Sequence, residues 1–460
     1  MISEPQLRNI VKGKGSKFIR LSMYLRGINQ IGQISKLYQS DLLLFCHDFT
    51  RNHIYNNYKY SSLIDSLSDL FTIKGISALT IARPYSQISP DKCYGNVFIV
   101  NGAFARARLA DFILSRLAII IPFLRSYTMS FQVRFWKLVL AKINPKIIIG
   151  IEPLKELCIA ARTAKIPVFD MQHGIMVATP TAHFYRTELR YPDQKGWPDF
   201  VICRDEISFS WLKVNRGQYT VPLLVGHPWL SRFASSNDEN DLVVKEAAGK
   251  LYANSDKPVI VYSLQHLRDA NGYPSSYSHI PTILENFIKS ESGKLYTWWF
   301  RLHPILLSEP NYSLVMKSLQ EKFGNYSNVD WQGPTFAALP CVFKIASLHL
   351  TRDSSTTIEA SLFGLPTGLL DVDENREILE EMYHNEIISG NASILSLTDP
   401  NALSLFIKNS VIRKSNSINL SELHKQEFRL LEFISDLSRY IKSKQRLNLN
   451  EILSDKFSEV

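Results

Sequence analysis

Two short segments of the chain end in a histidine at the point where a predicted strand gives way to a loop. His173 follows the apolar run 166–171, and His303 follows the aromatic run 296–301. A neutral imidazole can accept a proton from a hydroxyl group near neutral pH, and it can also donate to a phosphate oxygen. Because ligands of open parallel sheets bind at the carboxyl ends of the strands, the two histidines predict one site assembled from several loops.

The segment around His303 combines a cation with a rigid turn. Arg301 ends the predicted strand, and Pro304 follows the histidine. Proline cannot continue a strand ladder, so it is expected to hold His303 at the rim of the sheet. Arg301 and His303 would then face a phosphate group. The alternative is a structural histidine that satisfies a nearby carbonyl group.

A third cluster leads from a predicted strand into a helix expected at 355–363. Ser354 or Ser355 is the expected N-cap, and Glu359 follows soon after it. Free amide groups of the first turn, the helix dipole and the hydroxyl groups of Ser354, Ser355 and Thr356 predict an anion site. A plain capped helix is the alternative, but it explains one serine better than a run of hydroxyl residues.

The segment around His173 provides the candidate base. Gly174 permits a tight turn after the strand, and Asp170 is a candidate to orient the imidazole of His173. Gln172 and Gly174 are expected to line the same cleft, together with His227 after a later strand. A structural role is the alternative for His173 and for His227.

The common motifs of metal and nucleotide sites are missing from the sequence. It contains no HExxH, Walker A or GxGxxG motif, and its five cysteines form no CxxC pair. Asp371 and Asp373 match the short DxD pattern of some sugar transferases, but such a match is more typical of a solvated acidic loop. His47, after another strand, is interpreted as structural. We therefore expect no metal site and no cofactor.

Length and charge limit the kind of protein and its partners. A chain of 460 residues exceeds a typical single core, and 45% hydrophobic with 21% charged residues is typical of a folded soluble protein. The net charge of +9 favours anionic partners: nucleotides, acidic glycans, anionic lipid or nucleic acid. Scattered cysteines and the lack of an apolar secretory signal at the N-terminus predict a cytoplasmic location.

Two segments raise the question of a membrane. Leu109 to Leu124 contains Asp111 and Arg116 and is shorter than the roughly 20 apolar residues of a spanning helix, so a buried helix is expected. Residues 130–143 mix aromatic and aliphatic residues with basic ones. Such a helix either rests on a membrane surface or packs on the core in the ordinary way.

The remaining pattern alternates short apolar strands with helices. Strands are expected at 41–46, 77–82, 96–100, 146–151, 166–171, 200–203, 223–225, 258–263, 296–301, 329–331, 348–350 and 365–370. Helices are expected at 62–71, 103–120, 126–142, 153–165, 281–290, 312–323, 355–363, 400–410 and 421–442. This alternation predicts parallel sheets flanked by helices.

The polar stretch 230–257 is expected to connect two domains. The sequence thus predicts an α/β protein with an N-terminal Rossmann-like domain at 1–235, a C-terminal Rossmann-like domain at 256–420 and a helical tail at 421–460. We expect the two domains to face each other across a cleft and the C-terminal helices to cross back to the first domain.

These segments together resemble bacterial GT-B glycosyltransferases that build capsules and other surface polymers. The relatives in question are polysialyltransferases, capsule Kdo transferases and CDP-glycerol glycerophosphotransferases. The matching segments are Gln172-His173-Gly174, Gly226-His227-Pro228, Arg301-Leu302-His303-Pro304, Ser354-Ser355-Thr356, Glu359-Ala360 and Gly364-Leu365-Pro366.

The resemblance implies a role for each cluster. His303 with Ser354 and Ser355 would hold the phosphate of a cytidine nucleotide donor, and Glu359 would lie near the nucleoside. His173 looks like the counterpart of the catalytic histidine of the glycerophosphotransferases. The capsule enzymes carry an acidic pair before the glycine, where this chain has Gln172 and His173, so Asp170 is the second candidate for the base.

The resulting hypothesis is a metal-independent glycosyltransferase that extends a bacterial surface polysaccharide. Its donor would be CMP-linked Kdo or a sialic-type sugar, and its acceptor a glycan or lipid-linked glycan. It would work in the cytoplasm, in peripheral contact with the anionic inner face of the membrane and without nucleic acid. The alternatives are a glycerophosphate or UDP-sugar transferase on the same fold, a nucleotide-sugar 2-epimerase, and a non-catalytic basic scaffold that binds nucleic acid or polyanionic glycan.

Overall fold

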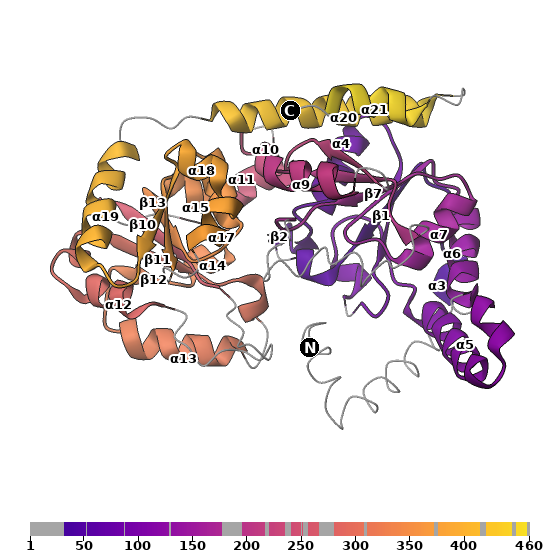
Figure 1. Ribbon diagram of the computed structural model, residues 1–460, viewed down its shortest axis with the longest axis horizontal. Coiled ribbons are helices and arrows are strands. Elements are labelled where there is room, and N and C mark those ends of the chain that lie inside the picture. Colours follow the sequence, from indigo (N-terminus) through magenta and orange to yellow (C-terminus); the bar gives the residue numbers. More distant parts are fainter. Residues whose placement is uncertain are drawn as a thin grey trace. The chain divides into compact units, whose positions relative to one another are not determined.

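The chain divides into two compact units. The computed structural model describes residues 32–51, 53–86, 88–127, 130–176, 196–216, 220–234, 241–249, 251, 256–265, 280–307, 311–371, 376–414, 420–443 and 448–457. The described parts of 3–229 and 428–460 form the first unit, and those of 230–427 form the second (Figure 1).

The first unit is built on a parallel sheet with helices on both faces. Within the described residues its strand order is β5 (Val97–Phe98), β4 (Ala78–Ala82), β1 (Leu42–Cys46), β6 (Ile147–Gly150), β7 (Val168–Met171), β8 (Phe200–Cys203) and β9 (Val221–Leu224). The helices that follow these strands are α4 (Ile64–Ile73), α5 (Asn101–Ile120), α6 (Ser130–Ile143), α7 (Lys155–Thr163) and α9 (Glu206–Arg216), with a short α3 (Gly32–Ser35) before the sheet.

The central strands are apolar on both faces, as a sheet covered by helices requires. Ile147 and Ile149 of β6 point into one core with α4, and Ile148 points into the other with α6 and α7. All three are fully buried. The strand expected at 146–151 is therefore present as β6 and is buried on both faces.

A close approach of two strands determines the residue that ends β6. Gly150 pairs with Phe45 of β1, and a Cβ atom at Gly150 would lie only 2.9 Å from the Cβ of Phe45. Only glycine fits there without moving the neighbouring strand. The residues that follow, His47 after β1 and Glu152 after β6, thereby start from adjacent points of one edge.

The second unit has the same architecture. The described strand order is β12 (Val329–Asp330), β11 (Thr297–Arg301), β10 (Val259–Ser263), β13 (Leu348–Thr351), β14 (Thr367–Asp371) and β15 (Ala392–Ser396), and all pairs are parallel. Its helices are α11 (Leu242–Ala248), α12 (Thr282–Lys289), α13 (Asn311–Phe323), α14 (Gly333–Phe336), α15 (Leu339–Ile345), α16 (Thr356–Leu362), α17 (Arg376–Met382), α18 (His384–Ile388) and α19 (Pro400–Lys414).

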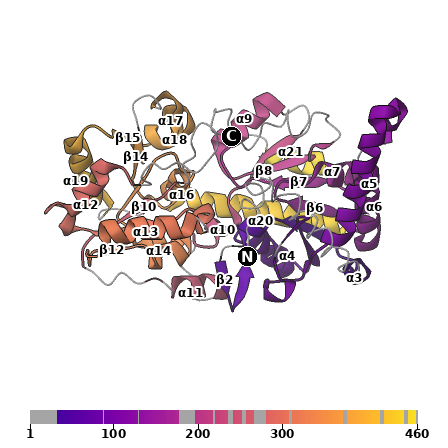
Figure 2. The ribbon, with the colours of Figure 1, turned by 90° about the horizontal axis from the view of Figure 1, so that it is seen from below.

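Two C-terminal helices return to the first unit, as predicted. They are α20 (Ser421–Lys442) and α21 (Leu449–Phe457). Phe433 and Leu437 of α20 and Leu453 of α21 belong to the same buried cluster as β1, β6 and β7. The rings of Phe433 and Phe169 lie 6.1 Å apart between their centroids. Figure 2 shows these helices along the strands of the first unit.

Several elements differ from the sequence-based prediction. The stretch 230–257 was expected to be a connection, but it contains α11, and α10 (Pro228–Ser231) begins just before it. The antiparallel hairpin of β2 (His53–Tyr55) and β3 (Tyr58–Tyr60) and the edge strand β15 were not predicted. Each is short, so its periodicity is weak. Asp373 of the DxD match lies outside the described residues.

The prediction of a buried helix at Leu109 to Leu124 is wrong. The segment is helical in α5, but Phe112, Ile113 and Ile120 are exposed at 53%, 52% and 78%. Of the two alternatives for residues 130–143, the structure shows packing on the core, since Phe135 and Trp136 of α6 are buried there.

The packing of α20 gives a direct test of its role. We expect Phe433→Ala to lower the free energy of unfolding by about 3–5 kcal/mol, because it leaves a cavity in the first core. Phe428→Ala on the same helix is the matched control, since Phe428 is exposed at 70% and should change stability by less than about 0.5 kcal/mol. Urea denaturation measures both, and equal effects would mean that α20 is not part of the core.

Candidate active site

Four charged or titratable side chains meet at the carboxyl edge of the first sheet. His47 follows β1, Arg83 follows β4, Glu152 follows β6 and His173 follows β7. The four strands are neighbours in the order β4, β1, β6 and β7. Four neighbouring strand ends therefore contribute side chains to one cluster that includes His173.

Glu152 is the centre of this cluster. Its Oε2 accepts a hydrogen bond of 3.1 Å from Nη1 of Arg83 and lies 3.7 Å from Nε2 of His47. Its Oε1 lies 3.7 Å from Nε2 of His173. The Glu152 side chain is only 6% exposed and that of His173 only 10%. One buried carboxylate thus lies among two imidazoles and a guanidinium group.

The backbone of Glu152 is held in an uncommon conformation. Its φ is +48°, in the left-handed region that non-glycine residues seldom adopt. Its N–H donates a 2.8 Å hydrogen bond to Oδ1 of Asp170 at the end of β7. Such conformations cluster at functional sites, where surrounding contacts maintain them.

Sequence reasoning missed Glu152. A carboxylate directly after the all-isoleucine strand, in Gly150-Ile151-Glu152-Pro153, was the signal that could have revealed it. Asp170, the expected partner of His173, is 2% exposed and binds the Glu152 backbone. The carboxylate of Glu152 lies beside His173.

Gln172 does not line a cleft, contrary to expectation, because it is fully buried. Its Nε2 donates to the carbonyl oxygen of Gly174 and to Oγ of Ser208, both at 2.8 Å. It also donates to Asp205, and its Oε1 accepts from the Arg204 N–H at 2.7 Å. The amide therefore ties the loop that carries His173 and Gly174 to the start of α9.

The structure favours the structural alternative for His227. The imidazole is 6% exposed, and its Nδ1 accepts a 3.2 Å hydrogen bond from the N–H of Trp229. Burial, and then the nearby Arg204, lower the pKa of His227 well below its usual value. A neutral, buried ring shapes the loop after β9.

In the second unit, the guanidinium group of Arg301 at the end of β11 donates hydrogen bonds to backbone carbonyl groups. Its Nη1 donates to the carbonyl oxygens of Pro334 and Ala337, the latter at 2.8 Å. Burial lowers the pKa of Arg301 to about 10, while the charge of Glu359 opposes that shift. Arg301 stays cationic at neutral pH, and Glu359 of α16 belongs to its electrostatic surroundings.

The turn after β11 has the expected form. Pro304 begins a short 3-10 helix, Pro304–Leu307, and the carbonyl oxygen of His303 accepts a 2.8 Å hydrogen bond from Leu306. The imidazole of His303 belongs to a half-buried residue at this strand end.

The hydroxyl cluster lies at the start of α16. Oγ of Ser354 accepts a 3.3 Å hydrogen bond from the N–H of Thr356. Ser355 is at the N-cap position, and its side chain makes no capping hydrogen bond. Ser354 thus supplies the side-chain contact that was expected of either serine.

A second residue that sequence reasoning missed is His349 in β13. It is fully buried, with Nδ1 3.1 Å from Oγ1 of Thr367 and Nε2 3.0 Å from Oγ of Ser263. Oγ1 of Thr356 lies 3.4 Å from the same Nε2. Burial lowers the pKa of His349 to about 3. This neutral ring links β10, β13, β14 and the first turn of α16.

No group of three or more His, Cys, Asp or Glu side chains within the described ranges is arranged to hold a metal ion. The cluster at the first sheet places an imidazole beside a carboxylate. Such a pair can take a proton from a hydroxyl group, because the carboxylate stabilises the imidazolium that forms.

Comparison with known proteins gives the fold. No protein-family model matches the chain, and no curated protein matches it. Among solved structures, the wall teichoic acid polymerase TagF has a TM-score of 0.52 at 13% identity, covering 94% of this chain and 100% of that chain. A TagF variant soaked with CDPG gives 0.51 at 14%, covering 93% and 98%.

The UDP-GlcNAc 2-epimerase from Neisseria meningitidis bound to UDP-GlcNAc is equally similar. Its TM-score is 0.53 at 12% identity, covering 86% of this chain and 99% of that chain. This chain has the GT-B fold. At such low identity the likeness establishes the two Rossmann-like units and no particular activity.

The buried imidazole of the second unit predicts a pH-dependent stability. A histidine titrates near pH 6.5 in the unfolded chain, whereas folded His349 resists protonation down to about pH 3. Its stabilising contribution is therefore present above pH 6.5 and is lost as the pH falls toward 3, at up to about 1.4 kcal/mol per pH unit.

We expect His349→Gln to weaken this dependence. Between pH 7 and pH 5, the wild type should lose about 2 kcal/mol more unfolding free energy than the variant, whose amide does not titrate. Urea unfolding at both pH values measures the difference, with His384→Gln on the exposed start of α18 as control. An equal pH dependence in wild type and His349→Gln would contradict the role of this residue.

Proposed function

We propose that this protein is a transferase that moves a glycosyl group from a nucleotide-activated donor to a hydroxyl group of a growing surface glycan. The observation that carries the proposal is the Glu152 cluster. It supplies a base with a paired carboxylate at the carboxyl edge of a parallel sheet, which is where ligands bind in this class of fold.

His173 is the proposed base. Its neutral imidazole removes the proton of the acceptor hydroxyl as the new glycosidic bond forms. Glu152, with Oε1 3.7 Å away, stabilises the resulting imidazolium. Arg83 and His47 hold the other carboxylate oxygen, so Glu152 keeps its orientation during the reaction. Asp170, which binds the Glu152 backbone, becomes a positioning residue rather than the base.

The second unit is the proposed donor side. The leaving nucleotide carries a phosphate, whose charge Arg301 and His303 would neutralise without need of a metal ion. The hydroxyl groups of Ser354, Ser355 and Thr356 would bind phosphate oxygens, and Glu359 would lie near the nucleoside.

The donor is proposed to be a pyrimidine nucleotide. The TagF variant was soaked with CDPG, and the epimerase is bound to UDP-GlcNAc, so ligands of these two proteins share that nucleotide class. CMP-linked Kdo or a sialic-type sugar is the finer form of the proposal. A glycerophosphate donor is compatible with the same residues.

A nucleotide-sugar 2-epimerase is the second candidate, since one such enzyme is as similar in fold as TagF. It would return an isomerised donor with no glycan product. Incubation with donor and acceptor, followed by separation of the products, distinguishes the two activities.

Replacement of the base tests the mechanism. We expect His173→Ala to reduce transfer by roughly 10²–10⁴-fold with donor binding retained, because the lost step is proton removal. Glu152→Gln keeps the size of the side chain but removes its charge, and should cost roughly 10²-fold for the same reason. Radiolabelled transfer to a glycan acceptor measures both.

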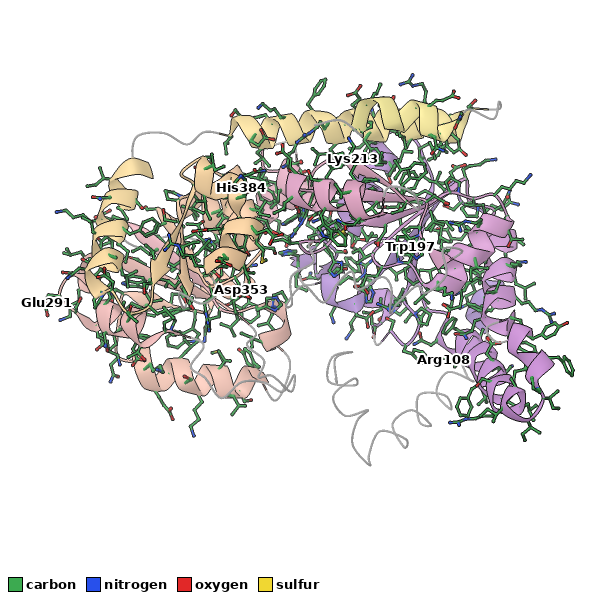
Figure 3. All side chains as sticks on the ribbon, in the orientation of Figure 1. Arg108, Trp197, Lys213, Glu291, Asp353 and His384 are labelled. Carbon is green, nitrogen blue, oxygen red and sulfur yellow. The ribbon has the colours of Figure 1, made fainter. Side chains whose placement is uncertain are left out.

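The matched control is Glu291→Gln, at a side chain 89% exposed on the second unit (labelled in Figure 3), which should transfer at the normal rate. Normal transfer by both His173→Ala and Glu152→Gln would show that the site is wrongly assigned. That result is what a non-catalytic scaffold predicts.

Nucleotide binding tests the donor side independently. In a thermal-shift screen with CMP, CDP, UDP and GDP, we expect a cytidine nucleotide to raise the melting temperature most. At a hundredfold excess over Kd, a ligand that binds only the folded form adds about 2.7 kcal/mol of stability.

His303→Ala should reduce this shift, whereas the control His384→Ala should not, since His384 is an exposed histidine of the same unit. Equal shifts for the two variants would remove His303 from the donor site. Stabilisation by GDP alone would overturn the pyrimidine assignment.

A further inference from the structure

An apolar surface faces outward on α5 and on the 3-10 segment that follows it, Pro122–Tyr127. We call it the hairpin surface and define it by six exposed large side chains. These are Leu109, Phe112, Ile113, Leu117, Ile120 and Phe123, with exposed fractions from 44% to 78%. Contiguous exposed apolar residues of this extent are typical of an interaction site rather than of an ordinary surface.

The spacing of these residues is that of one helix face. Leu109, Phe112, Ile113, Leu117 and Ile120 recur at intervals of three and four, which is the pattern that normally packs on a core. Here the opposite side of α5 is buried, with Phe104 and Ala118 inward. The helix therefore presents its long apolar stripe away from the described core of the first unit.

A buried carboxylate maintains this orientation. Asp111 is 5% exposed, and its oxygens accept hydrogen bonds of 3.0 and 2.9 Å from the N–H groups of Phe131 and Gln132 and one of 3.0 Å from the Gln132 side chain. It thus caps the start of α6 from a neighbouring helix. Rotation of α5 to bury the stripe would break these bonds and leave a buried charge unpaired.

The charge of the segment is strongly positive. Residues 101–143 contain seven Lys or Arg residues and one acidic residue, the buried Asp111. The guanidinium group of Arg116 lies 5.1 Å from the ring centroid of Phe112, and that of Arg134 lies 5.7 Å from that of Phe131. Arg108, labelled in Figure 3, lies 5.4 Å from the ring centroid of Tyr85. Cations therefore border the apolar stripe.

We propose that the hairpin surface inserts into the interface of an anionic lipid bilayer. An apolar stripe bordered by arginines matches the acyl boundary below and the phosphate headgroups around it. None of the described helices is long and apolar enough to cross a membrane, so α5 would lie in the plane of the interface. The inference does not depend on the chemistry proposed for His173.

Vesicle binding by the full-length protein tests this proposal. We expect co-sedimentation with vesicles of phosphatidylcholine mixed with phosphatidylglycerol, weaker binding to phosphatidylcholine alone, and a loss of binding as salt is raised. The double variant Ile120→Ser with Phe123→Ser should weaken binding to the mixed vesicles by at least roughly tenfold, because two inserted apolar side chains are lost.

The matched control removes one isoleucine and one phenylalanine elsewhere. Ile388→Ser with Phe336→Ser changes side chains exposed at 71% and 63%, against 78% and 70% for Ile120 and Phe123. The control should bind vesicles as the wild type does. Arg116→Glu should weaken binding to the mixed vesicles by roughly tenfold and leave binding to neutral vesicles unchanged.

Three results would overturn the proposal: no binding to mixed vesicles, equal binding by the two double variants, or a dimer in solution that only Ile120→Ser with Phe123→Ser converts to monomer. The last result would make the surface an interface between copies of this chain. Transfer to a soluble acceptor should be the same in all of these variants, so failure here is distinguishable from failure of the proposed function.

Discussion

The buried carboxylate of Glu152 is the constraint on which the edge of the first sheet depends. A charge removed from water must be paired, and its partners Arg83, His47 and His173 come from three further strand ends. A slip in the register of any of these strands would separate the charges. The left-handed backbone of Glu152 is in turn anchored by Asp170 of β7. The sheet order and the cluster therefore support each other.

The buried imidazole of the second unit, His349, lies among neutral groups rather than charged ones. His349 is surrounded by hydroxyl groups of Ser263, Thr356 and Thr367, and among the described residues it has no charged hydrogen-bond partner that would favour its protonated form. A neutral ring of this kind fixes the spacing of three strands and one helix. The two units thus share an architecture but differ in their polar clusters. The first has the charged cluster around Glu152, and the second has the neutral network around His349.

The helices α5 and α6 show why amphipathic patterns need a third dimension. Both carry apolar residues at helical spacing, and the sequence favoured burial of the first and left the second open. In the structure α6 buries Phe135 and Trp136 in the core, whereas α5 exposes Phe112 and Ile120. Helical periodicity predicts that the apolar face of a helix is covered by other apolar groups. The hydrogen bonds of Asp111 to the start of α6 fix the orientation of α5, and therefore which of its faces is turned toward the core.

The sequence by itself determined the alternation of buried strands and helices, and with it two parallel sheets and the position of His173 and His303 at strand ends. Apolar runs and proline or glycine breaks are local signals, so they can be read without a model of the fold. Only the tertiary structure decided that Glu152 lies beside His173 and that Gln172 is buried. These outcomes depend on which strands are neighbours and on the φ of a single residue, and contacts between residues far apart in the chain determine both.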